Sequence, residues 1–345
     1  MSVSTGATLQ PDELLDAARA GDDDAFRQLV EAHLPDLHAH CYRMLGSVHD
    51  AEEAMQDTLL RAWRGLEGFE GRSAPSSWLY TIATNCCLDV IARRTKRMLP
   101  IDYAPPAGPG SEPGEPVAAP VWLEPYPDER LGLDDGYAAP EARYERRESV
   151  ELAFVAALQH LLPRQRAVLI LREVLGFSAR EVADALDTSV ASVNSALQRA
   201  RKAIDERLPE QSQQATRRAL GDERVRHLVQ RFTDAFESGD VQDILELLTD
   251  DVKFAMPPYA DWYQGREAIS DSWLMPGGPP PRLRYRPSSA NGQLALGTYA
   301  LDRASGRYTA IALDVLTLRG DRIAEIFAFR TPEEFPRFGL PLELA

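Results

Sequence analysis

The chain has 345 residues, 44% of them hydrophobic, so it is long enough for two or three domains with ordinary apolar cores. It has no run of about 18 apolar residues, and its first residues lack a charged stretch followed by an apolar one, so we expect a cytoplasmic protein without a membrane span or signal peptide. The net charge of −15 excludes a free-standing nucleic-acid binder of the usual basic type. Contact with DNA would need local basic patches and help from another protein.

Residues 12–98 are predicted to be helical throughout. Between residues 51 and 66, apolar or small residues recur on one helix face and polar residues occupy the other. Ser47 and Asp50 predict a capping box at the start of this helix. A loop rich in Gly and Ser follows at 67–77, and SWLYTIATNCCLDVIARRTKR then predicts a second helix that ends in a basic cluster.

The three cysteines of the chain all fall in this first segment. Cys41, Cys86 and Cys87 show neither a disulfide framework nor zinc spacing, so we predict no metal site and no cofactor. Adjacent small thiols on an inward helix face are commonly buried core residues, and we prefer that interpretation to redox sensing.

Residues 99–144 form a predicted linker that is rich in proline and acid. Ten of the 25 prolines lie between Pro100 and Pro140. Such a stretch buries too little apolar surface to fold alone. Yet its sequence VWLEPYPDERL, at 121–131, carries large apolar side chains that are normally buried.

Residues 145–208 predict a helix-turn-helix. Gly176 is a natural stop for the first helix. Ser178 and Glu181 form a capping box for a short helix, and Ser189 caps a longer, basic one after a tight turn.

Residues 222–345 change character and predict an α+β domain. Two helices are expected at 222–238 and 240–249. Five β-type runs follow, VKFAM, RLRYRPS, QLALGTYAL, YTAIALDVLTL and IAEIFAFR, with turns at RASGR and RGDR. Helices followed by an antiparallel meander are typical of this class.

Two of these segments resemble the conserved regions of an extracytoplasmic-function (ECF, or group IV) sigma-70 family factor. Residues 50–97 resemble region 2, and LPRQRAVLILREVLGFSAREVADALDTSVASVNSALQRARKAI resembles region 4. VQRFTDAFESGDVQDILELLTDDVKFAMPP and YQGREAISDSW resemble the SnoaL-like, or NTF2-like, fold, and WLEPYPDE resembles a linker motif of sigma factors with that extension. The resemblance implies a multidomain chain with an all-α region 2 bundle, an all-α region 4 helix-turn-helix and an α+β cone.

A sigma factor is not an enzyme. The resemblance implies that the chain binds RNA polymerase core, through its β′ and β subunits, and directs it to promoter DNA. The alternative is a SnoaL-type enzyme or ligand sensor fused to a helix-turn-helix regulator that acts without polymerase core. The acidic total disfavours this alternative, because independent DNA binding depends on neutralising phosphates. An anti-sigma partner stays unknown.

The resemblance places the polymerase-binding surface on the polar face of the helix from residue 50 to residue 66. Its candidates are Glu53, Gln56, Asp57, Leu60, Arg61 and Arg64. Read from the pattern alone, the same face is a solvated surface with i,i+4 pairs such as Asp57–Arg61.

The loop at 68–77 and the helix after it resemble the element that captures an unstacked base of the minus-ten sequence. Stacking on aromatic rings would offset the free energy of unstacking. The candidates are Phe69, Arg72, Ser73, Trp78, Tyr80 and Asn85, with Arg93, Arg94, Lys96 and Arg97 for phosphates. Trp78 is equally a core candidate, and basic residues are also favoured at a helix C-terminus for electrostatic reasons.

The second helix of the helix-turn-helix would enter the major groove at the minus-thirty-five element. Its candidate contacts are Ser189, Ser192, Asn194, Ser195, Gln198 and Arg199, with Arg201 and Lys202 for phosphates. Relatives often carry Lys or Arg where Asn194 and Ala196 stand, which predicts weak contact or an unusual promoter sequence.

In the C-terminal segment, Trp262, Trp273 and Asp314 are candidates for a ligand pocket inside the cone. Asp314 could act there as a base, although a buried, hydrogen-bonded carboxylate is the commoner case. We prefer a regulatory or ligand-sensing domain.

The apolar residues of the linker are predicted to anchor it. We expect Trp122, Leu123, Pro125 and Tyr126 to dock against the C-terminal domain or in the crevice between domains. Docking would hold the two DNA-binding domains at a defined separation and make the extension a built-in inhibitor. The alternative is an extended spacer with chance aromatic residues.

Overall fold

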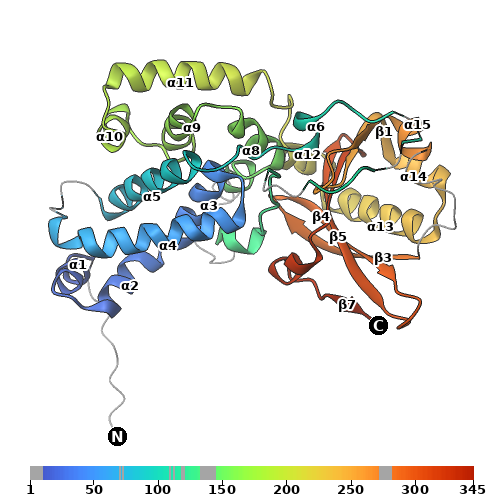
Figure 1. Cartoon of the computed structure of the whole chain (residues 1–345), viewed down its shortest axis with the longest axis horizontal. Helices are drawn as coiled ribbons and strands as arrows, with labels where there is room; N and C mark the ends of the chain where they lie inside the picture. The colour runs from blue at the N-terminus through green and yellow to red at the C-terminus, as the bar shows by residue number, and fades with distance from the viewer. Residues whose placement is uncertain are drawn as a thin grey trace, which may run out of the picture.

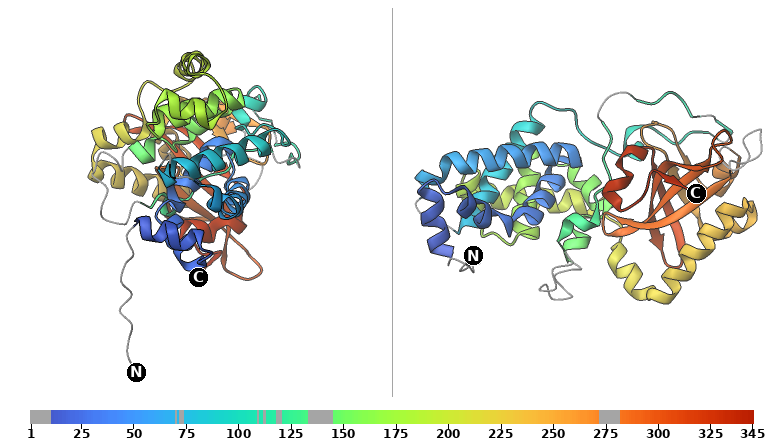
Figure 2. Two further views of the ribbon diagram at one scale, coloured as in Figure 1. Left: turned by 90° about the vertical axis from the view of Figure 1, so that its left-hand side faces the viewer. Right: turned by 90° about the horizontal axis from the view of Figure 1, so that it is seen from below.

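A computed structural model describes residues 11–69, 71, 74–108, 110–111, 113–117, 121–132, 145–271 and 282–345 of the chain. Helices fill one half of the molecule, and a sheet with its own helices fills the other (Figure 1). The view from below in Figure 2 separates the two halves and shows the chain after α5 running from the helical half to the sheet half.

The helical half contains two groups of helices. The first group is α1 (Pro11–Arg19), α2 (Asp23–Glu31), α3 (Leu34–Leu45), α4 (Val48–Gly65), the short η1 (Leu66–Gly68) and α5 (Pro75–Ile91). The second is α8 (Leu152–Gln159), α9 (Pro163–Leu169) with a π-helical continuation (Ile170–Val174), α10 (Ala179–Ala185) and α11 (Val190–Asp205). Between them lie α6 (Pro100–Tyr103) and η2 (Asp128–Leu131).

The predicted serine caps are present at the starts of α4, α10 and α11, but at Ser47 only half of the predicted capping box forms, because no return bond from Asp50 accompanies the serine cap. Ser47 accepts from the Asp50 amide at 3.1 Å, and Ser189 accepts from the Ser192 amide at 3.1 Å. Ser178 and Glu181 form the complete reciprocal box. These short-range hydrogen bonds satisfy amides that the first turn of a helix leaves unpaired.

The sheet half contains α12 (Gln213–Leu220), α13 (Asp222–Ser238), α14 (Val241–Leu247), α15 (Arg266–Ile269) and η5 (Pro332–Phe338). Its strands are β1 (Leu248–Ala255), β2 (Trp262–Gln264), β3 (Leu283–Ala290), β4 (Gln293–Leu301), β5 (Tyr308–Arg319), β6 (Arg322–Phe329) and β7 (Glu343–Leu344). The order is β2-β1-β6-β5-β4-β3, with β7 beside β5.

The predicted meander holds for β3 to β6, which pair antiparallel in sequence order. The first predicted strand differs, because β1 pairs parallel with β6 and makes the sheet mixed. Strands β2 and β7 and helix α12 were not predicted. The two strands have three and two residues, too few for an alternating pattern to emerge.

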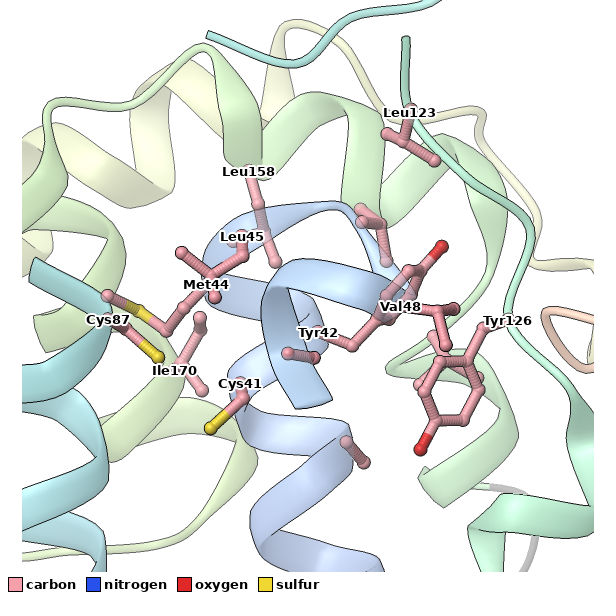
Figure 3. Packing of buried hydrophobic residues seen from close by; sticks show 14 of the residues in the cluster. Cys41, Tyr42, Met44, Leu45, Val48, Cys87, Leu123, Tyr126, Leu158 and Ile170 are labelled. Carbon is pink, nitrogen blue, oxygen red and sulfur yellow. The ribbon is translucent and has the colours of Figure 1, made fainter. Parts of the chain in front are cut away.

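The sheet separates two cores. One face packs against α13, where Phe232 and Phe236 meet Tyr285 of β3. The other face joins a second, larger core that continues through the linker into both groups of helices. Figure 3 shows part of this core, with Tyr42 of α3, Cys87 of α5, Tyr126 of the linker and Leu158 of α8.

Candidate functional site

The six predicted polymerase-binding residues lie on one exposed face of α4. Glu53, Gln56, Asp57, Leu60, Arg61 and Arg64 are all exposed. Leu60 exposes 52% of its surface, as isolated apolar side chains on protein surfaces commonly do. Arg61 forms its ion pair with Asp89 of α5 at 3.0 Å, not within α4.

The predicted minus-ten aromatic residues are packed against other parts of the protein. Phe69 is buried and packs against Trp78 in a tilted arrangement, with ring centroids 4.8 Å apart. Tyr80 is buried between His40 and Phe177, so its ring contacts the second group of helices. Asn85 is exposed. Arg72 and Ser73 lie outside the described residues.

Three of the four predicted phosphate-binding cations after α5 have partners within the protein. Arg94 pairs with Asp50 and Glu53. Arg97 is buried, pairs with Asp50 at 2.9 Å, and donates to the Trp122 carbonyl at 3.1 Å. Lys96 contacts His160 at 3.0 Å. Arg93 is exposed.

The predicted minus-thirty-five face of α11 is exposed along its length. Its members are Ser189, Ser192, Asn194, Ser195, Gln198, Arg199, Arg201 and Lys202. Val193 and Leu197 point inward, as the helical pattern predicts. Arg201 pairs with Glu173 at 2.7 Å, and the hydroxyls of Ser189 and Ser192 contact each other at 2.9 Å.

The linker motif lies on α3 and on the start of α4. Trp122, Leu123, Pro125 and Tyr126 are all buried. Residues Met98 and Trp122 form a parallel bridge, and the Leu123 amide donates to the Met98 carbonyl at 3.0 Å. The motif therefore lies at the junction between the first helices and the sheet half. Its apolar side chains are buried against these neighbours, because the linker alone has too little apolar surface to bury them.

The Tyr126 hydroxyl lies 2.8 Å from Nδ1 of His38. Because Arg130 donates to Nε2 of His38 at 3.0 Å, Nδ1 carries the proton and donates to Tyr126. Burial and, to a lesser extent, the nearby positive charge of Arg130 lower the pKa of His38 to about 4, so this imidazole is neutral at physiological pH.

Glu124, which was not singled out from the sequence, ties the motif to α4. Its carboxylate accepts from the Val48 amide at 2.8 Å, at the helix N-terminus, where negative charge is favoured. Its backbone accepts from the Tyr42 hydroxyl at 2.7 Å and donates to the Gly46 carbonyl at 3.0 Å.

The tip of the β3–β4 hairpin joins this motif to both groups of helices. Asn291 is fully buried, and its side chain accepts from the Tyr126 amide at 2.9 Å. The same side chain donates to the Tyr42 hydroxyl and to the Val150 carbonyl, both at 2.8 Å. One residue of the sheet half thus contacts the first helices, the linker and the segment before α8. An Asn-Gly pair between two strands predicts a tight hairpin, but nothing local predicts its burial.

Helix α12 provides a second junction that the sequence did not reveal. Glu151 accepts from the amides of Gln213 and Gln214, both at 2.9 Å, at the start of α12. The Gln213 side chain pairs with the backbone of Leu318 in β5 at 2.7 and 3.0 Å. Burial raises the pKa of Glu151 to about 7, while the two amides oppose the rise.

The three candidates for a pocket inside the cone are not brought together. Asp314 is buried on the α13 side and accepts from Thr298 at 2.7 Å. Trp262 belongs to the core on the opposite face, and its indole donates to the Ala104 carbonyl at 2.7 Å. The prediction of a shared pocket is therefore wrong for these two residues. Successive side chains in a strand point to opposite faces: Phe254 and Tyr263 face α13, so the next pair, Ala255 and Trp262, faces the other way. Trp273 lies outside the described residues.

Burial raises the pKa of Asp314 to about 7, and the hydrogen bond from Thr298 opposes the rise. A hydrogen-bonded core carboxylate accounts for this geometry. Within the described ranges, no group of three or more His, Cys, Asp or Glu side chains is placed to hold a metal ion. None of the helices in these ranges is both long and apolar enough to cross a bilayer.

Family models match the three folded parts of the chain in order. Sigma-70 region 2 matches residues 29–97, sigma-70 region 4 matches residues 151–204, and a SnoaL-like domain matches residues 229–326. The fold and these matches define a sigma-70 type protein with a SnoaL-like C-terminal domain.

Sequence similarity to known proteins places the chain in a subgroup of the sigma-70 type proteins. The ECF RNA polymerase sigma factor SigG of Mycobacterium tuberculosis (strain ATCC 25618 / H37Rv) is 43% identical over 326 residues, which cover 94% of this chain and 85% of that protein. SigW of Bacillus subtilis (strain 168) is 30% identical over 192 residues, which cover 55% of this chain and 92% of that protein. This chain belongs to the ECF RNA polymerase sigma factors.

A solved structure shares the whole architecture. The crystal structure of the Mycobacterium tuberculosis ECF sigma factor SigJ matches with a TM-score of 0.53 and 22% identity. The match covers 89% of this chain and 96% of that one. At this identity the likeness concerns the fold.

Proposed function

We propose that this sigma factor binds the β′ and β subunits of polymerase core, with the polar face of α4 as its main contact, and directs the enzyme to promoter DNA. Residues 12–98 would carry polymerase and minus-ten binding, and residues 145–208 minus-thirty-five binding. The exposure of both the α4 face and the α11 face supports this assignment.

We further propose that the conformation described here is a closed form, in which regions 2 and 4 pack too closely to engage a promoter together. Arg166 of α9 donates to the Met44 carbonyl, and Gln159 of α8 donates to the Arg43 carbonyl at 3.2 Å. Promoter elements about 25 base pairs apart lie roughly 85 Å apart along the duplex. Domains in direct contact cannot span that distance.

The linker explains how the closed form would open. Fully extended, residues 99–144 reach roughly 150 Å, which is ample for the promoter spacing. Docked on α3 and α4, the motif at 121–131 keeps the described part of this segment close to the packed domains. Release of the linker is therefore the step that permits opening.

The C-terminal SnoaL-like domain, residues 222–345, would act as the clamp that keeps the linker docked. The observation that carries this proposal is Asn291, whose side chain hydrogen-bonds to Tyr126, Tyr42 and Val150 at once. Removal of the clamp leaves these buried groups unpaired, so the closed form depends on it.

In this proposal the protein works in the cytoplasm beside polymerase and DNA and has no catalytic residue. Asp314 is assigned to the interior of the cone, where Thr298 satisfies its carboxylate. We do not propose a ligand site inside the cone, because Trp262 lies on the face of the sheet opposite to Asp314.

Reversal of one charge on α4 tests the polymerase contact. Asp57→Arg is expected to weaken core binding by the full chain at least tenfold and to reduce run-off transcription in parallel, because exposed charge reversal disrupts an interface more than a fold. Asp243→Arg, on the exposed face of α14, is the matched control and is expected to change neither.

Pull-down of the chain with polymerase core gives the results that would contradict the proposed function. If neither the full chain nor a truncation ending at Glu223 binds bacterial polymerase core, the proposed function is wrong. If both bind and Asp57→Arg has no effect, the α4 assignment alone is wrong.

A further inference from the structure

A cavity of about 280 Å³ lies where the end of region 2 meets region 4. Its lining includes Asp50, Arg94, Lys96, Arg97, His160 and Arg166. The first four of these residues belong to region 2 and the last two to region 4. We call this space the interdomain cavity.

The interdomain cavity has more cations than anions. Asp50 is shared between Arg94 and Arg97. Lys96 and Arg166 have no carboxylate within ion-pair distance among the described residues. Two positive charges at this junction are therefore held without an ionic partner.

Arg166 is the more constrained of the two. It exposes 4% of its surface and donates to neutral oxygens only, among them the Gln159 side chain at 2.6 Å and the Gln159 carbonyl at 3.1 Å. Its buried Nε has no hydrogen-bond partner. Burial lowers the pKa of Arg166 to about 10, which leaves it charged at neutral pH. An unpaired donor on a buried cation is costly unless an acceptor can reach it.

Lys96 lies at the rim of the cavity with donors to spare. It gives one N–H to Nδ1 of His160 at 3.0 Å, and Nε2 of His160 then donates to Asp102 at 3.1 Å. This arrangement requires a neutral imidazole. Burial lowers the pKa of Lys96, and the positive charges of Arg166 and Arg207 lower it further while Asp102 opposes them. The remaining two N–H groups of Lys96 are free to bind an anion.

We propose that the interdomain cavity binds a small free anion that carries a phosphate group, and that this anion stabilises the closed form. Phosphate oxygens accept several charge-assisted hydrogen bonds from Lys and Arg, the groups that this cavity offers. Because region 2 supplies Lys96 and region 4 supplies Arg166, the complete site exists only while the two regions are packed together. Binding to one form alone shifts the equilibrium toward that form.

This inference rests on the proposed function, and it adds a competition between a free phosphate compound and promoter DNA for the same cations. Arg94, Lys96 and Arg97 are also the residues proposed to hold promoter phosphates in the open form. A free phosphate compound and the promoter backbone would then bind the same cations in alternate conformations. The phosphorylated compound would inhibit initiation without contacting the polymerase.

Inorganic pyrophosphate is the probe that tests the site on the full chain. We expect saturable binding with one site per chain in titration calorimetry, and slower protease cleavage of the linker at saturation. Lys96→Met is expected to weaken binding at least tenfold, because one charge-assisted contact is lost. Lys253→Met is the matched control, since Lys253 pairs with Glu325 in the sheet half at 2.9 Å and should bind as the wild type does.

Two outcomes overturn the inference. One is non-saturable binding, or equal binding by wild type and Lys96→Met, which would leave only non-specific attraction. The other is tight binding of promoter DNA with no binding of pyrophosphate, which would assign the cations to DNA alone. Either result leaves core binding by the α4 face intact, so failure of this site is distinguishable from failure of the proposed function.

Discussion

Replacement of Asn291 by alanine is expected to open the closed form. The substitution removes three buried side-chain hydrogen bonds and leaves the Tyr126 amide without its partner. Each unpaired buried group costs about 1–3 kcal/mol. The backbone φ of 55° adds a penalty for alanine, because asparagine tolerates this region better. A total of about 3 kcal/mol would shift the equilibrium toward the open form roughly 150-fold.

Two readouts on the full chain measure this effect. Limited proteolysis should cut the linker faster in Asn291→Ala, and run-off transcription at a fixed, limiting amount of protein should rise. Asn291→Gly separates the causes, since glycine accepts the φ but makes none of the hydrogen bonds. Asp321→Ala, in the exposed β5–β6 turn, is the control and should behave as the wild type. Unchanged linker cleavage in both Asn291 variants would show that the hairpin tip is no clamp.

Tyr126→Ala is expected to produce the second large effect, by releasing the linker itself. The Tyr126 side chain is fully buried, packs on Tyr42 with ring centroids 4.5 Å apart, and holds His38 at 2.8 Å. Truncation of a buried aromatic side chain to alanine typically costs about 3–5 kcal/mol. Urea unfolding of the full chain should show the loss of stability, and protease should cut the linker faster.

Milder substitutions give a predicted order for the linker variants. Tyr126→Phe keeps the packing and loses only the bond to His38, so we expect a smaller effect, about 1–3 kcal/mol. Trp122→Ala should also be milder than Tyr126→Ala, since the Trp122 indole nitrogen makes no hydrogen bond and the residue keeps 8% of its surface exposed. If Tyr126→Ala neither destabilised the chain nor exposed the linker, the linker would be a passive spacer.

Structural features that depend only on residues close together in the sequence were predictable. Serine caps at Ser47, Ser178 and Ser189 act within three residues, and each is present in the structure. The alternating runs of β3 to β6 predicted the meander for the same reason. Helix caps and strand alternation can be recognised in the sequence because all the residues that form them lie within a few positions of each other.

Helix α12 was missed because its burial is polar. Gln213, Gln214 and Thr216 are buried through hydrogen bonds, not apolar contacts, so no hydrophobic period marks the helix. The parallel pairing of β1 with β6 joins residues about 70 positions apart, and a strand pattern does not reveal its partner.

The candidate site divides in the same way. Exposure of the α4 and α11 faces follows from helical periodicity, which predicts the side opposite the core. The ion pairs of Arg94 and Arg97 with carboxylates, and the hydrogen bonds of Asn291, join segments that are distant in the sequence, so the sequence did not predict them. Trp262 was misplaced because a three-residue strand does not indicate which face its side chains occupy.

The most direct test of the closed form is a distance between regions 2 and 4. Spin labels at Gln28→Cys in α2 and Glu206→Cys beyond α11 are exposed, whereas the natural Cys41, Cys86 and Cys87 are buried. The closed form predicts a single narrow distance distribution in the free full-length protein, and a distance longer by tens of ångströms once polymerase core and promoter DNA are bound. The same distance in both states, or a broad distribution in the free protein, would contradict it.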